Sequence, residues 1–341
     1  MTCLQANTVR ASAGRELCYD NIRGLLIFSV VLGHLLEICV PFPGSNYLYQ
    51  LIYSFHMPAM IFLLGYFARF SLRKILFGWL LPYIVLQIGY ICFEKYILGA
   101  AISLQFRTPH WILWFLVVGL YYQLLIPLYD RKRCLCKILM LGGSLLLALG
   151  VGYIDDIGYS GSLSRFFVFQ PFFLLGFYAS RRPKKAVTGR SRLLVALLSF
   201  AAFALCAAIL YRLEPSNAML FGAHPYSALG HNAAIRGFFM VMGLSMIVFL
   251  FYGCKHLADR RIPLLTCLGQ NTLSVFLLHG FGVKLLGHYF PSAVRKPWGV
   301  LLCAGALLLI FGNPGVGKAV RFLCSDRWLP FQKKKRPAEK A

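Results

Sequence analysis

The chain has 341 residues, of which 59% are hydrophobic and 13% are charged, whereas a soluble domain carries about 25% charged residues. So few charges cannot cover a water-facing surface, and apolar runs of about 18–20 residues match a hydrocarbon layer about 30 Å thick. The net charge of +24 would favour nucleic acid as the partner of a soluble protein, but here the basic residues lie in short loops that orient helices. The composition therefore excludes a soluble nucleic-acid-binding protein. It predicts an all-α, polytopic protein of the lipid bilayer.

The apolar runs predict about ten transmembrane helices, separated by turn residues such as those of Pro41-Phe42-Pro43-Gly44. In chain order they cover residues 22–40, 50–68, 75–93, 111–129, 137–152, 164–180, 193–211, 233–253, 268–286 and 298–316. We predict three parts: a cytoplasmic N-terminal segment 1–21, a transmembrane domain 22–317 and a basic cytoplasmic tail 318–341.

The distribution of basic residues predicts the orientation of these helices. With the N-terminus in the cytoplasm, 27 of the 35 Lys and Arg residues lie on the cytoplasmic side and 8 on the other, so both termini are expected to be cytoplasmic. The first span contains His34 and Glu37 and ends without a small-x-small site, so we expect no cleaved signal peptide.

Two residue patterns that often indicate cofactor sites lack a required part. The eleven cysteines form no CxxC pair, and most lie inside apolar runs, which is typical of small apolar fillers rather than of a metal site. Gly312 to Lys318 has the spacing of a P-loop, but Ala319 replaces the Ser or Thr that binds Mg²⁺. We therefore predict no metal and no nucleotide hydrolysis.

The first span carries three ionisable residues, which are costly in a bilayer and indicate function. Arg23 and His34 are eleven residues apart, so they share one helix face with about 16 Å between them along the axis. Glu37 lies about one turn beyond His34. This helix is expected to present a cation at the cytoplasmic rim and a His/Glu pair in the outer half of the membrane.

The second span returns with His56, which we expect at a depth similar to that of His34, and Pro58 can shape a cavity between the two helices. The alternative is that these side chains only form hydrogen bonds between helices. Arg165 begins the sixth span and either binds an acceptor or reaches for the membrane surface. His279, in the ninth span, has either a packing or a catalytic role.

Several of these residues belong to motifs of a known family. Arg23-x10-His34, preceded by Tyr19-Asp20-Asn21, resembles the opening signature of the membrane acyltransferase 3 family. The continuation from Tyr53 to Pro58 is similar to the fucose 4-O-acetylase-like branch. Weaker similarities are Trp111-x-x-Trp114, Ser162-Leu163-Ser164-Arg165 followed by Pro171 to Gly176, and Gly269 to Ser274 before His279.

The resemblance implies ten membrane helices, cytoplasmic acetyl-CoA as the donor and a carbohydrate hydroxyl on the far side as the acceptor. Cytoplasmic cations suit the phosphates of CoA, and Arg23, Arg69, Arg73 and Lys74 are the candidates for binding them. The acceptor is expected to be a polysaccharide or lipid-linked glycan, and the location a bacterial plasma membrane.

In the mechanism that we expect, His34 is the general base on the acceptor hydroxyl and Glu37 orients its ring. His56 or Arg165 stabilises the tetrahedral oxyanion, and Arg165 and His279 bind substrate. An acetyl-histidine intermediate on His34 is an open alternative.

The second hypothesis is a proton-coupled transporter or flippase for a glycan-lipid or small anion, with His34, Glu37 and His56 as a proton relay. The sequence shows neither an inverted repeat nor paired broken helices, which such transporters often contain. A structural scaffold would leave the charged groups of the first span unexplained.

Overall fold

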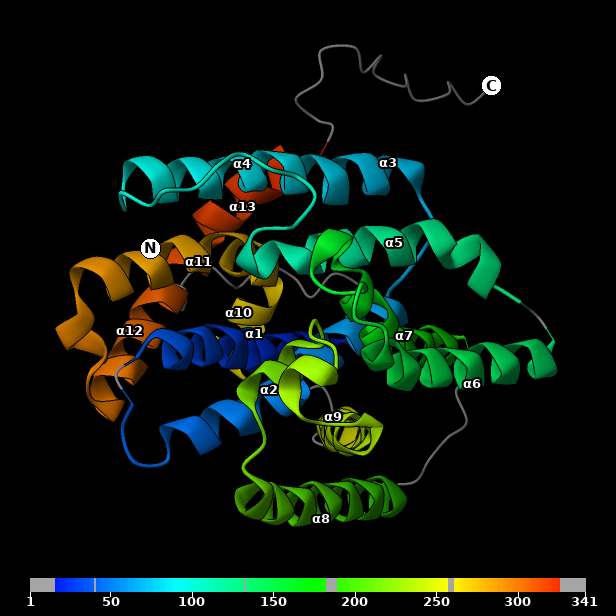
Figure 1. Ribbon diagram of the computed structural model, residues 1–341. Helices are drawn as coiled ribbons and strands as arrows, with labels where there is room; N and C mark the ends of the chain where they lie inside the picture. Colours follow the sequence, from blue (N-terminus) through cyan, green and yellow to red (C-terminus); the bar gives the residue numbers. More distant parts are fainter. Residues whose placement is uncertain (1–15, 40, 132, 182–188, 257–260, 326–341) are drawn as a thin grey trace, which may run out of the picture.

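The computed structural model describes residues 16–39, 41–131, 133–181, 189–256 and 261–325, and over these ranges the chain is helical with no strand (Figure 1). Residues 1–15 of the predicted N-terminal segment and residues 326–341 of the predicted basic tail lie outside the described residues. The helices are α1 (Leu17–Ile38), α2 (Ser45–Tyr66), α3 (Leu72–Ile75), α4 (Leu81–Tyr96), α5 (Trp114–Tyr129), α6 (Cys134–Gly150), α7 (Leu163–Ser180), α8 (Gly189–Leu213), α9 (Ala233–His256), α10 (Pro263–Gln270), α11 (Thr272–Tyr289), α12 (Pro297–Phe311) and α13 (Pro314–Leu323). Shorter helical turns are η1 (Leu76–Leu80), η2 (Trp111–Leu113), η3 (Val151–Tyr153), η4 (Ser160–Ser162), η5 (Asn217–Phe221), η6 (Ser227–Leu229) and η7 (Pro291–Val294).

Seven helices of the described residues are long and apolar enough to cross a bilayer, and the count rises to nine if each of two bent pairs forms one span. The segment predicted over 164–180 forms α7, which carries the buried polar residues Arg165 and Gln170 and is not among the nine. Because the described residues form helices and no strands, and several of these helices can cross a bilayer, the prediction of an all-α, multi-pass protein is confirmed. The count of ten spans and the side of each terminus stay predictions.

Two of the predicted spans include a bend, although the sequence predicted no paired broken helices. Helices α10 and α11 meet at 84° and α12 and α13 at 59°. At the first bend, the Asn271 side chain donates to the Cys267 carbonyl and accepts a hydrogen bond from Arg321 of α13. At the second, the Asn313 side chain accepts from the Gly315 N–H at the start of α13. Asparagine favours such bends because its side chain competes for backbone hydrogen bonds.

The two bent pairs also bear on the choice between an enzyme and a transporter. The sequence predicts no paired broken helices, which disfavours a transporter, whereas the structure contains two bent pairs. This feature therefore does not exclude a transporter, and the site and the comparisons with known proteins decide between the two.

Close backbone contacts hold α1, α2, α7 and α10 together. On α2, a side chain at Gly65 would overlap the Phe173 carbonyl of α7, and one at Gly176 of α7 would overlap the Phe62 carbonyl of α2. Similarly, a side chain at Gly24 of α1 would overlap the Leu265 carbonyl of α10. Small residues permit such close approach between membrane helices, so the helix that carries His56 is held rigidly against its neighbours.

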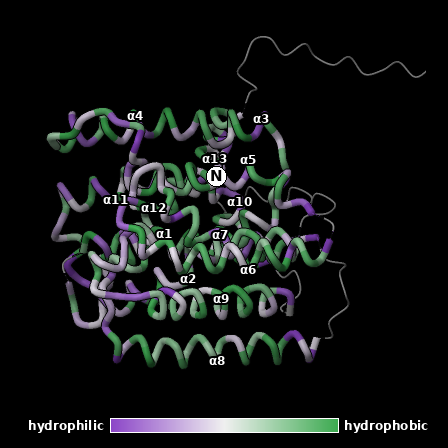
Figure 2. Tube along the Cα trace, turned by 45° about the vertical axis from the view of Figure 1, so that its right-hand side comes forward, coloured by the Kyte–Doolittle hydropathy of each residue, from purple (hydrophilic) through white to green (hydrophobic). Residues whose placement is uncertain are grey.

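Two long apolar segments lie at the edges of the bundle. Helices α8 and α4 run along opposite edges in both views, and Figure 2 shows α8 as largely hydrophobic with polar residues toward its ends. Leucines such as Leu194, Leu198 and Leu205 of α8 are exposed, as expected for a surface that faces lipid. In the interior of the bundle, by contrast, His56 of α2 is buried and His34 of α1 is half-buried.

Candidate active site

A cavity of about 280 Å³ opens between α1, α2, α7 and the segment that leads into α5, and we call it the outer cavity after the side that the sequence predicts. Of the predicted site residues, His34, Glu37, His56 and Arg165 line it. Its other polar or aromatic lining residues are Tyr53, Gln105, Thr108, His110, Trp111, Trp114, Tyr159, Phe169, Phe221 and Phe276.

The centre of the outer cavity is a pair of side chains from α1. His34 Nδ1 lies 3.0 Å from Glu37 Oε2, three residues further along the same helix face. The Tyr53 hydroxyl, from α2, lies 3.0 Å from the same nitrogen and donates to Glu37 Oε2 over 3.1 Å. Because the carboxylate accepts the Nδ1 proton, a neutral His34 carries its lone pair on Nε2. That arrangement suits a general base.

Trp111 closes one side of the His34 ring. The two rings contact edge to face with centroids 4.7 Å apart, and the Trp111 side chain also lies within hydrogen-bonding range of Glu37. Trp111 has a φ of +40°, which is unusual for a residue with a side chain. Strained backbone of this kind persists only where the surrounding structure holds it, and it gathers at functional sites.

Charged side chains of α4 and α11 pack next to Trp111 and its neighbour His110. Lys284 of α11 forms an ion pair with Glu94 of α4, and its ammonium lies 4.8 Å from the centre of the Trp111 ring. Glu94 also accepts a hydrogen bond from His110 Nε2 at 2.8 Å. Gln87 of α4 accepts from the His110 N–H. The loop before Trp111 is therefore tied to α4 by side chains rather than by regular structure.

His56 and His279 are both buried, and each forms hydrogen bonds to backbone carbonyls. His56 Nδ1 donates to the Ile52 carbonyl over 2.8 Å, so a neutral ring presents a lone pair at Nε2 and lacks the N–H that an oxyanion needs. His279 Nδ1 donates to the carbonyls of Val275 and Phe276. The His279 ring lies 5.3 Å from that of His34 and does not line the outer cavity, so the geometry supports a role through His34 rather than the expected contact with substrate.

Arg165 supplies the positive charge of the outer cavity. It sits in the first turn of α7, is only 7% exposed, and donates from Nε to the Phe221 carbonyl over 3.0 Å. Its guanidinium lies over the rings of Trp114 and Tyr159, 5.0 and 4.8 Å from their centres. The remaining N–H groups of Arg165 make it a better donor to an oxyanion than His56.

A second cavity of about 340 Å³ contains three of the four predicted CoA-binding cations, and we call it the inner cavity. Arg23, Arg69 and Lys74 line it together with Phe67, Gln123 and Thr272. Arg23 also contacts Asp20 at 3.4 Å and lies over the Phe67 ring. Arg73 is exposed and does not line the cavity, because its side chain leaves α3 in a different direction from that of Lys74.

Comparisons with known proteins agree with this geometry. The Acyl_transf_3 family, described as an acyltransferase domain, matches residues 16–312. The chain belongs to this acyltransferase family. A stretch of 64 residues is 34% identical to nodulation protein NolL of Sinorhizobium fredii (strain NBRC 101917 / NGR234), and it covers 18% of this chain and 18% of that protein. No solved structure matches the chain.

Family membership confirms the prediction of an acyltransferase enzyme of a membrane. The fucose 4-O-acetylase-like branch stays a prediction. Among the described residues of this acyltransferase, no group of three or more His, Cys, Asp or Glu side chains could hold a metal ion.

Several residues of this acyltransferase site are not among the candidates predicted from the sequence. Tyr53 begins the motif that contains His56, so its spacing is a signal that could identify it. Trp111 lies in a motif that resembles the family only weakly. Glu94 and Lys284 come from distant parts of the chain, and nothing in the local sequence indicates that they form a pair.

Proposed function

We propose that this acyltransferase moves an acetyl group from cytoplasmic acetyl-CoA to a hydroxyl of a carbohydrate, in the plasma membrane of a bacterium. The observation that carries the proposal is the His34–Glu37–Tyr53 group in the outer cavity, on the far side of a narrow apolar layer from the basic inner cavity. The match to a bacterial nodulation protein supports the bacterial setting.

The inner cavity suits the donor. CoA carries several phosphate charges, and Arg23, Arg69 and Lys74 offer charge-assisted hydrogen bonds at one mouth of the cavity. The rest of the lining is mainly apolar, with side chains such as Leu63 and Phe115. A pantetheine arm fits such a lining, and it would carry the thioester toward His34.

The outer cavity suits the acceptor and the chemistry. His34 Nε2 takes the proton of the acceptor hydroxyl as its oxygen attacks the thioester carbonyl, and Glu37 stabilises the resulting imidazolium. Arg165 stabilises the negative oxygen of the tetrahedral intermediate. The C–S bond then breaks, the His34 imidazolium gives its proton to the sulfur, and CoA leaves as the thiol. Transfer through an acetyl-histidine on His34 uses the same residues and remains the alternative route.

The aromatic rings of the outer cavity favour a sugar as the acceptor. Trp111, Trp114 and Tyr159 present apolar ring surfaces beside polar groups such as Gln105 and Thr108. Pockets of this mixed kind bind ligands that have both apolar faces and hydroxyl groups. A polysaccharide or a lipid-linked glycan meets that description.

The function is tested by thiol release from acetyl-CoA by the purified protein in detergent, with and without a crude glycan fraction of the cell envelope. Release that the glycan stimulates supports the acetyltransferase. A transporter has the two bent helix pairs in its favour, but it would need a sealed compartment and would consume no acetyl-CoA. Absence of both CoA binding and thiol release from folded protein would overturn the proposal in favour of the transporter.

Lys74→Ala is expected to raise KM for acetyl-CoA by about 10- to 150-fold while kcat changes little, because a lost charge-assisted hydrogen bond to phosphate costs about 1.5–3 kcal/mol of binding. Arg73→Ala is the matched control, since Arg73 is the neighbouring cation but does not line the inner cavity. Initial rates over a range of acetyl-CoA concentrations measure both variants. Equal effects of the two substitutions would contradict a specific donor site in the inner cavity.

A further inference from the structure

The layer that separates the two cavities is about one helical turn thick. On α2, Met57 lines the outer cavity and Met60 the inner one. Ile112 lines the outer cavity and Phe115 the inner one, again three residues apart in η2 and α5. Three residues of helix span about 4.5 Å. Phe276 of α11 lines both cavities, so at that point the barrier is a single side chain.

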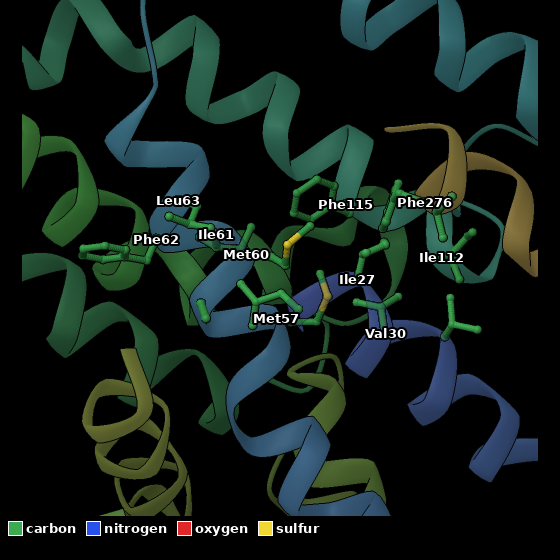
Figure 3. Close-up of a cluster of buried hydrophobic side chains, with 14 of the residues drawn as sticks. Ile27, Val30, Met57, Met60, Ile61, Phe62, Leu63, Ile112, Phe115 and Phe276 are labelled. Atoms are coloured by element: carbon green, nitrogen blue, oxygen red, sulfur yellow. The ribbon is translucent and has the colours of Figure 1, made fainter. Parts of the chain in front are cut away.

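The barrier is apolar and closely packed. Figure 3 shows Met60 beside Phe115, with Met57 and Phe276 in the same cluster of buried side chains. The rings of Phe115 and Phe276 have centroids 4.9 Å apart, and none of these side chains is more than 9% exposed. Charged phosphates cannot enter such a layer without a large desolvation cost. Only the apolar or weakly polar end of an acyl thioester can pass.

If the proposed function holds, part of the donor must cross this layer during the reaction. The phosphates of the donor bind at Arg23, Arg69 and Lys74, whereas the base His34 lies in the outer cavity. The thioester carbonyl must therefore reach across the layer, and the acyl group must move past the Phe276 ring. A methionine side chain has three rotatable bonds and can bend to open a narrow path, whereas the phenylalanine ring is rigid and can move only as a whole.

We infer that Phe276 determines which acyl groups this enzyme transfers: its ring leaves room for acetyl and excludes longer chains. The inference rests on the proposed function. Each additional methylene must find space in a layer packed at the density of a protein interior, where overpacking costs free energy. The reaction is unchanged: the C–S bond of the thioester breaks, a C–O bond to the acceptor forms, and the acceptor proton goes to His34.

The test compares acetyl-, butyryl- and hexanoyl-CoA as donors for the purified full-length protein, with the glycan fraction as the acceptor. Phe276→Ala is expected to raise the ratio of kcat/KM for butyryl-CoA to kcat/KM for acetyl-CoA at least about tenfold, since one or two methylenes in an apolar pocket are worth about that much. Phe276→Trp is expected to slow transfer from acetyl-CoA. Phe281→Ala is the matched control, because Phe281 lies on the same helix, stacks on Tyr90 and lines neither cavity.

An unchanged donor ratio in an active Phe276→Ala variant, or an equal shift in Phe281→Ala, would overturn the inference and leave the proposed function intact. A folded Phe276→Ala protein that is inactive with every donor would overturn it too. If that variant does not fold, Met57→Ala widens the same layer and must shift the ratio in the same direction. A wild-type protein that does not use acetyl-CoA would refute the proposed function, and the inference with it.

Discussion

His34→Ala is expected to lower the rate of acetyl transfer by about 10²–10⁴-fold, the usual contribution of a positioned general base. A sugar hydroxyl is weakly nucleophilic at neutral pH, and the lone pair on His34 Nε2 is held in place by Glu37 and Tyr53. The same loss is expected if His34 carries the acetyl group, because both routes need the imidazole. The measurement is glycan-dependent thiol release at saturating acetyl-CoA.

His288→Ala is the control for this substitution, since His288 is an imidazole of α11 that does not line the outer cavity. It should leave the rate unchanged. Glu37→Gln tests the role of the negative charge beside His34. The neutral amide can still accept a hydrogen bond from the His34 ring but does not stabilise its imidazolium, so kcat should fall while KM for acetyl-CoA is retained. Normal acetylation by the His34→Ala protein would refute both catalytic routes.

Gly65→Ala is expected to destabilise the fold by about 3 kcal/mol, near the upper end of the range for overpacking. The added methyl group would overlap the Phe173 carbonyl of α7, and backbone cannot move aside as a side chain can. Helices α2 and α7 would have to separate, and His56 and Arg165 would then move apart. Thermal unfolding of the detergent-solubilised protein, followed by size-exclusion chromatography, measures the effect.

Gly142→Ala is the matched control, because a Cβ at this exposed position of α6 meets no other atom within 4 Å. Alanine is the better helix former by about 1 kcal/mol, so this variant should be as stable as the wild type or more so. Equal melting temperatures for the Gly65→Ala and Gly142→Ala proteins would show that the close contact between α2 and α7 does not support the fold.

Much of the architecture could be predicted from the sequence, because the length of an apolar run reflects the thickness of the bilayer. The His34–Glu37 pair could also be predicted, since the two residues are three positions apart on one helix and the helical repeat places them on one face. The eleven-residue spacing of Arg23 and His34 likewise predicts that they lie apart along the helix, and the two residues line different cavities. These are local properties of a single helix, and they need no knowledge of the neighbouring helices.

The tertiary structure decided what joins different helices. Tyr53 reaches His34 only because α2 packs beside α1, and Trp111 is held against His34 by Glu94 and Lys284 from two further helices. The bend at Asn271 likewise depends on contacts across the fold, such as the hydrogen bond from Arg321 of α13, and the apolar run through it does not indicate a bend. The physical reason is that hydropathy and periodicity indicate which segments can cross the bilayer and which residues share one face of a helix. The contacts that build the site depend instead on which helices pack together and at what angle.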